Sequence, residues 1–275
     1  MQVAGSATET LMFVWDAMPL LKHVTLEDVD LRTPALLGQS HIALDNLQHL
    51  EYLSAKHLAL TRHSAVQLFA DLPLSLTTLL LDGTAFCDAA APFLADLVNL
   101  QHVSLSQRPG THSAMQPDVS LTCDFSAAAA HQAFSALTAL RSLDLHKCCM
   151  PDETTVALLK ALPKSMRELD ISLNHFPACA APLVAALEGL RSLRIGYKYE
   201  SMSDKVALAL AEHITRLSEL RFFDAEWYPS PQVSPDACMA MMRSLRALPH
   251  VNKSAANCFQ HSLTAWWPGA AGGLL

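Results

Sequence analysis

The feature that most constrains this chain is an apolar pattern that recurs along nearly all of it. The clearest copy runs from Met166 to Phe176, with the sequence MRELDISLNHF and apolar residues at its first, fourth and sixth positions. Self-similarity at a period of about 20 to 50 residues is typical of solenoids. The other copies start at Leu21, Leu50, Leu76, Leu100, Leu140, Leu190 and Leu220, and a degenerate ninth copy starts at Leu248.

Each copy predicts one short strand followed by one helix. Around the fourth and sixth positions apolar and polar residues alternate with period two, which indicates a strand buried on one face. The segments between the strands have helical periodicity and span 63–72, 88–97, 125–137, 152–162, 178–187, 204–217 and 235–245. A strand and helix of about 27 residues cannot enclose a core alone, so each unit must stack on its neighbours.

The stacking predicts a curved α/β fold. Strands stack about 4.8 Å apart whereas helices need about 10 Å, so the helical layer is the longer arc. We therefore expect a right-handed α/β horseshoe with a concave parallel sheet and convex helices, built from about eight repeats and a degenerate C-terminal cap. A doubly wound fold with a nucleotide site would need a glycine-rich first turn, and the nine glycines form none.

The repeats resemble those of the leucine-rich repeat superfamily, in particular the long, helix-containing repeats of ribonuclease-inhibitor-like proteins. The resemblance covers about Leu20 to Leu248. Within the motif an Asn is expected after the strand, and only Asn174 provides it; other copies have Val29, Leu58, Thr84 or Cys148 there. The resemblance implies a non-catalytic module that binds a protein through the concave sheet and its loops.

The domain organisation follows from the same frame. Residues 1–267 are predicted to form a single solenoid domain, with an N-terminal cap at 1–19, a C-terminal cap at 248–267 and a loose tail at 268–275. One interval between repeats is 40 residues long, whereas the others are 24 to 30. It contains a turn-rich inserted loop at 107–124, which is either a harmless insertion or a projecting addition to the binding surface.

Composition excludes several classes of protein. Most of the 47 leucines have a regular place in the repeat frame, and half of the 275 residues are hydrophobic, so the chain is not disordered. A net charge of −7 argues against nucleic-acid binding. Seven scattered cysteines without a C-x-x-C pair, no signal sequence and no apolar run long enough to span a membrane indicate a cytoplasmic protein. We expect a monomer.

The frame also predicts which side chains project from the sheet. In the C-terminal half these carry several carboxylates and an aromatic edge, which either form a solvated polar surface or bind a basic or mixed-charge protein partner. The candidate partner-binding residues are Tyr52, Asp144, His146, Glu168, Asp170, Arg194, Phe222, Asp224, Glu226 and Trp227.

A second column of charged residues occupies the position directly after the first apolar residue of the repeat. It contains Arg141, Arg167, Arg191 and Arg221, with Lys22 in the first repeat. We expect these side chains to bridge acidic neighbours such as Asp144, Glu168 or Glu188, and the alternative is capture of an anion.

No catalytic residues, cofactor or metal site are predicted. His146, Cys148 and Cys149 are close in sequence but lack a second pair of ligands with metal-site spacing, so we expect at least one of these cysteines to fill the core. Two alternatives to a simple binding module stay open. One is the substrate-recognition part of a ubiquitin-ligase adaptor, although too few residues precede the first strand for an F-box. The other is a GTPase-activating regulator, for which Arg108 is the candidate residue.

Overall fold

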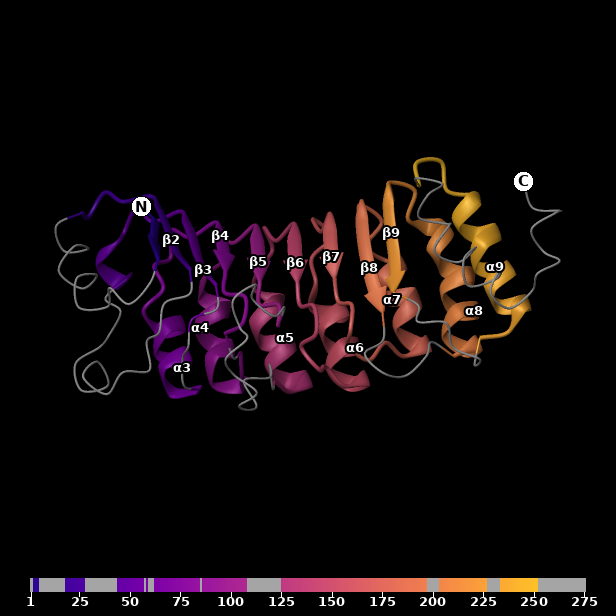
Figure 1. Cartoon of the computed structure of the whole chain (residues 1–275), viewed down its shortest axis with the longest axis horizontal. Helices are drawn as coiled ribbons and strands as arrows, with labels where there is room; N and C mark the ends of the chain where they lie inside the picture. Colours follow the sequence, from indigo (N-terminus) through magenta and orange to yellow (C-terminus); the bar gives the residue numbers. More distant parts are fainter. Residues whose placement is uncertain are drawn as a thin grey trace.

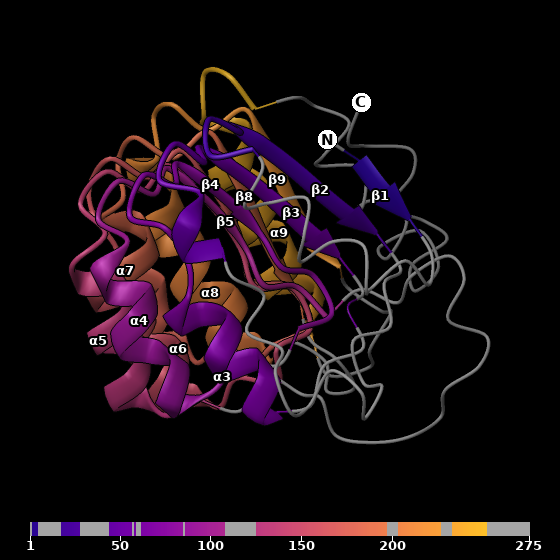
Figure 2. The same cartoon turned by 90° about the vertical axis from the view of Figure 1, so that its left-hand side faces the viewer.

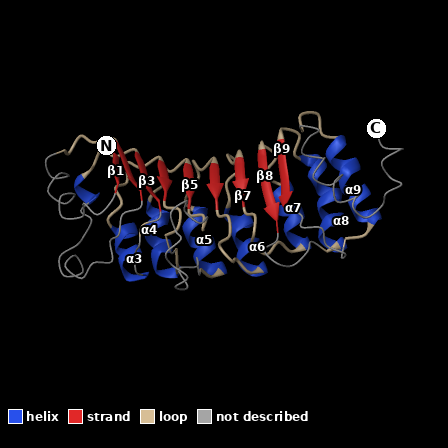
Figure 3. Ribbon diagram, viewed as in Figure 1, coloured by secondary structure: helices blue, strands red, loops and turns tan. Residues whose placement is uncertain are grey.

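The computed structural model describes residues 2–4, 18–27, 44–56, 58, 62–84, 86–107, 125–196, 203–226 and 233–251. These residues form one parallel sheet of nine strands whose order in space is their order in the chain. The strands form one layer and the helices another (Figure 3). The strands are β1 (Gln2–Ala4), β2 (His23–Glu27), β3 (Tyr52–Lys56), β4 (Thr78–Leu80), β5 (His102–Ser104), β6 (Ser142–Asp144), β7 (Glu168–Asp170), β8 (Ser192–Gly196) and β9 (Phe222–Glu226).

The strand register confirms the predicted repeat frame. The fourth position of every repeat lies beside the fourth position of the next, from Val24 and Leu53 in β2 and β3 to Leu193 and Phe223 in β8 and β9. All eight predicted strands are therefore present in the predicted alignment. The frame missed β1, which pairs with β2 in parallel.

The seven predicted helical segments are also confirmed, and they cover one side of the sheet (Figures 1 and 2). We call the opposite side the inner face. The helices are α3 (Arg62–Ala70), α4 (Ala91–Asp96), α5 (Ala127–Ser135), α6 (Asp152–Ala161), α7 (Ala181–Ala185), α8 (Asp204–His213) and α9 (Pro235–Arg246), with short 3-10 turns at Leu44–Asn46, Asp88–Ala90, Ala178–Ala180 and Ile214–Arg216.

The core lies between the two layers and consists of stacked rows of apolar side chains. The leucines of successive strands are almost completely buried, as Leu53, Leu79 and Leu143 illustrate. Each such side chain stabilises the fold by about 1.5–3 kcal/mol relative to an exposed one. Phe86 adds an aromatic cluster, with its ring centroid 5.4 Å from that of Phe69 and 5.1 Å from that of Phe125.

The ends of the inserted loop are tied to the neighbouring repeats. Gln107 donates its backbone N–H to the carbonyl of His146 at 2.9 Å and its side-chain amide to the carbonyl of Thr84 at 3.0 Å. At the other end, Ser126 donates its N–H to Asp88 at 2.7 Å. Residues 108–124 lie outside the described residues, as do most of the predicted N-terminal cap and the tail.

Within the described ranges, no helix is both long enough and apolar enough to cross a membrane.

Candidate protein-binding face

The inner face presents three columns of side chains that run across the strands. The first precedes the fourth position of each repeat, the second follows it, and the third follows the sixth position. The first column is exposed or half-buried throughout, from His23 in β2 to Phe222 in β9. The other two were predicted to project as well, but several of their residues are buried because side chains on strands about 4.8 Å apart cover one another. The buried polar members are Ser54, Asp82, Ser104, Ser106, Asp170 and Ser172.

Asp170 is the centre of a hydrogen-bonded cluster in the C-terminal half. Its Oδ1 accepts from the hydroxyl of Ser172 at 2.5 Å and from the N–H of Ser172 at 3.1 Å. The same hydroxyl lies 2.9 Å from Nδ1 of His146. Because the single hydroxyl proton is given to Asp170, Nδ1 of His146 must be the donor in that contact. This cluster joins the ends of β6 and β7.

Arg194 extends this cluster to the last strand. One guanidinium nitrogen lies 3.6 Å from Oδ2 of Asp170, and the guanidinium carbon lies 5.0 Å from the centre of the Phe222 ring. A cation over an aromatic face is stabilised by the ring quadrupole. Phe222 is 38% exposed. A continuous series of contacts therefore runs from His146 to an accessible aromatic ring across four strands.

Three further carboxylates surround this cluster. Asp144 accepts the backbone N–H of His146 at 2.9 Å, and Glu168 accepts the hydroxyl of Ser142 at 3.1 Å. Asp224 is half-buried and lies beside Arg194 in the strand register. We call Asp144, Glu168, Asp170 and Asp224 the acidic cluster. It contains four carboxylates against the single cation of Arg194, so its charge is negative.

The N-terminal half of the inner face contains a charge pair that was not predicted from the sequence. Asp82 is 9% exposed and lies 3.2 Å from the ammonium of Lys56. It also accepts the hydroxyls of Ser104 and Ser106, the latter at 3.1 Å. Lys56 and Asp82 occupy the third column of adjacent repeats, so the frame alone could have paired them. The charges of Lys56 and Asp82 therefore compensate each other within the N-terminal half.

The three other predicted site residues lie in β3, at the end of β9 or beyond the described part. Tyr52 is half-buried, and its ring lies 5.8 Å from that of His23. The backbone of Glu226 pairs with Gly196 at the end of β9. The side chain of Glu226 and the whole of Trp227 lie outside the described residues.

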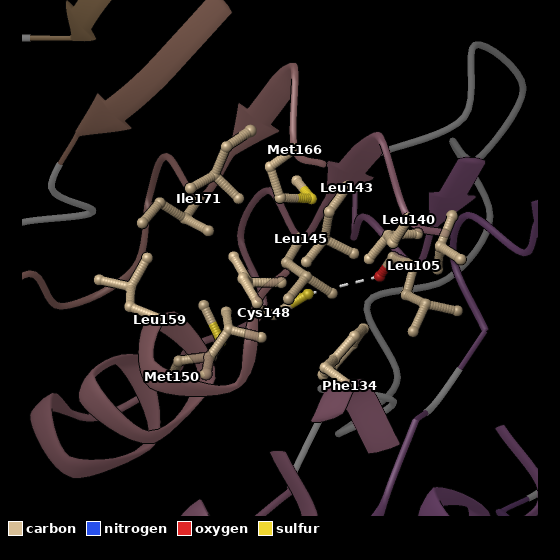
Figure 4. Packing of buried hydrophobic residues seen from close by; sticks show 14 of the residues in the cluster. Leu105, Phe134, Leu140, Leu143, Leu145, Cys148, Met150, Leu159, Met166 and Ile171 are labelled. Carbon is tan, nitrogen blue, oxygen red and sulfur yellow. Dashed lines mark hydrogen bonds between the residues drawn. The ribbon is translucent and has the colours of Figure 1, made fainter. Parts of the chain in front are cut away.

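The turn after β6 shows what Cys148 does. Its side chain is fully buried, which confirms the core-filling role expected of at least one cysteine. Its thiol lies 3.4 Å from the carbonyl oxygen of Leu105, among side chains that include Leu145, Phe134 and Met150 (Figure 4). Cys149 is half-buried. Among the described residues, no group of His, Cys, Asp and Glu side chains could hold a metal ion.

The basic column lies at the edge where the strands begin, and most of its predicted ion pairs are wrong. Glu188 instead pairs with Arg216 at 3.6 Å, and the guanidinium of Arg167 donates to the backbone carbonyls of Met166 and Lys164. Among the ranges that the structure describes, only the first repeat has an ion pair at this column. This pair joins Lys22 to Glu51 at 2.6 Å. The hydrogen bond and charge of Lys22 lower the pKa of Glu51.

No family model matches the sequence, and no curated protein matches it. Among solved structures, the fold is similar to a chain in the crystal structure of the Rad7 and Elc1 complex in yeast. The TM-score is 0.52, and the sequence identity is 16% over 82% of this chain. The fold is that of a leucine-rich repeat solenoid. This chain spans 62% of the length of the chain that it matches.

Proposed function

We propose that this chain is a non-catalytic module that binds a protein partner through the C-terminal half of the inner face. The observation that carries the proposal is the contact of Arg194 with both Asp170 and Phe222. These contacts hold an accessible aromatic ring beside the acidic cluster before any partner arrives. Aromatic side chains beside charged groups often dominate the affinity at the centre of an interface. A side chain that is already held in place loses little conformational entropy on binding.

The charge of this half indicates the chemistry of the partner. The acidic cluster favours a basic or mixed-charge segment, and the exposed Phe222 favours an apolar side chain within it. The nine strands are separated by eight spacings of about 4.8 Å, so the inner face is about 38 Å long. With the flanking loops, this is enough for a standard interface of about 800 Å² on each partner. We propose a cytoplasmic monomer in this role.

Affinity capture with matched charge variants tests the proposal. Glu168→Arg with Asp224→Arg reverses two accessible carboxylates of the acidic cluster and spares the buried Asp170. Asp96→Arg with Glu212→Arg makes the same change in charge on exposed helix residues. Proteins captured from cells that express the chain should be lost with the first variant and kept with the second. Equal capture by both variants would contradict the proposal.

A second candidate function is that of a subunit in a stable assembly, as in the ubiquitin-ligase adaptor alternative. It is supported by the similarity to a chain that was solved in a complex of Rad7 and Elc1. Size-exclusion chromatography of the captured material at high salt distinguishes the two, because a stable subunit stays bound whereas a charge-dependent partner is released. The GTPase-activating alternative depends on Arg108, which lies outside the described residues.

A further inference from the structure

The edge at which the last four described repeats enter the sheet has a charge opposite to that of the whole chain. We call the turns 138–141, 164–167, 188–191 and 216–221 the arginine edge. Against a net charge of −7 for the protein, this edge contains two acidic residues, Glu188 and Glu219, and six basic ones. The basic residues are Arg141, Lys164, Arg167, Arg191, Arg216 and Arg221.

Three of these guanidiniums are available to a ligand. Arg141, Arg191 and Arg221 are exposed, and within the described ranges no ion pair engages their side chains. The backbone carbonyls of Arg141 and Arg191 are already used, because each accepts two N–H groups from the following repeat. Glu188 is paired with Arg216 at 3.6 Å, and among the described residues it forms no ion pair with these three arginines.

The arginine column reduces the stability of the protein when no ligand is bound. Residues at the same position of adjacent strands lie about 4.8 Å apart, and like charges at that separation destabilise a sheet. In the N-terminal half the same column contains one cation, Lys22, and Glu51 compensates it at 2.6 Å. An acidic ligand would compensate the C-terminal half in the same way.

We propose that the arginine edge binds an acidic, carboxylate-bearing segment of a partner protein. A guanidinium matches a carboxylate with two parallel hydrogen bonds. In an extended segment, side chains on one side recur about every 6.8 Å, so alternate carboxylates can reach guanidiniums on neighbouring strands. The acidic cluster lies on the adjoining inner face and would repel a long polyanion such as a nucleic acid. This site is separate from the inner face, so either proposal can fail alone.

Fluorescence anisotropy with a labelled hexaglutamate peptide at low salt tests this site on the full chain. The triple variant Arg141→Gln, Arg191→Gln, Arg221→Gln should weaken binding about tenfold or more, since each exposed pair adds a modest amount. The control Lys160→Gln, Lys205→Gln, Arg243→Gln removes the same charge from exposed helix residues and should change affinity less than about twofold. Replacing the three arginines by lysine should give an intermediate loss.

Each other outcome overturns the proposal. No binding by the wild type, or an equal loss in edge and control variants, shows that the edge is not a site for carboxylates. If a single-stranded oligonucleotide or a phosphoserine peptide binds more tightly than hexaglutamate and loses this binding in the triple variant, the edge is assigned to phosphate instead. Self-association that the triple variant abolishes assigns it to a second copy. Phe222→Ala should leave peptide binding unchanged, and a loss there would show that the peptide binds the inner face.

Discussion

Cys148 and Asn174 have equivalent roles in successive repeats. The thiol of Cys148 contacts the carbonyl oxygen of Leu105 at 3.4 Å, and the side-chain amide of Asn174 donates to the carbonyl of Leu145 at 2.8 Å. Leu105 and Leu145 occupy the same position of the preceding repeats. The cysteine therefore replaces the expected asparagine with a weaker hydrogen-bond donor. Both repeats thus have a contact from the turn after the strand to the preceding repeat.

Replacing Asn174 with Ala should destabilise the protein by about 2–4 kcal/mol, because its amide also donates to Ile171 and its Oδ1 accepts from the N–H of Met150. Cys148→Ala should cost less, about 1–2 kcal/mol, since a thiol is a small apolar group and a weak donor. Urea denaturation followed by circular dichroism measures both values. Equal costs would show that the asparagine has no special role.

The buried Asp82 should be the most sensitive charge of the N-terminal half. Asp82→Ala removes the partner of Lys56 and the acceptor of two serine hydroxyls, and we expect a loss of about 2–3 kcal/mol. Lys56→Ala should cost less because Ser104 and Ser106 still bind the carboxylate. Denaturation of the two single variants and the double variant measures their coupling. Additive effects would contradict the contact.

The pair of Lys22 and Glu51 gives a pH dependence with a defined sign. The pKa of Glu51 is lowered in the folded protein, so its contribution to stability is present above the unfolded pKa and is lost as the pH falls through the folded pKa. In Lys22→Ala the pKa of Glu51 should rise. Carbon-detected NMR titration of the Glu51 carboxyl group measures this change, and an unchanged pKa would rule out Lys22 as its cause. High salt should reduce the difference.

Gly189→Ala should move the guanidinium of Arg167. A Cβ at residue 189 would clash with one terminal nitrogen of that guanidinium, which is the flexible end of its side chain. Arg167 would lose its contact of 2.8 Å with the Met166 carbonyl, and we expect a cost below about 1 kcal/mol. Thermal denaturation measures this cost. A loss of several kcal/mol would show that Arg167 cannot leave its place.

The fold could be predicted from the sequence because a two-residue period and a repeat length together determine which residues align. This is why Val24, Leu53 and their equivalents fall in register. β1 is only three residues long and does not contain the repeat pattern, so it was not predicted. The contacts of the site were less predictable, because they depend on side-chain conformation. Asp170 was expected to project freely, yet it is 8% exposed because Ser172 and Arg194 enclose it.

The central claim is that the partner binds the inner face beside Phe222, and photo-crosslinking tests it most directly. A benzoylphenylalanine in place of Phe222 puts the reactive group on the inner face. One in place of Leu208, which is 47% exposed on α8, puts it on the helical side. With the captured partner present, the inner-face position should form a crosslink and the α8 position should not. A crosslink only from the α8 position would contradict the claim.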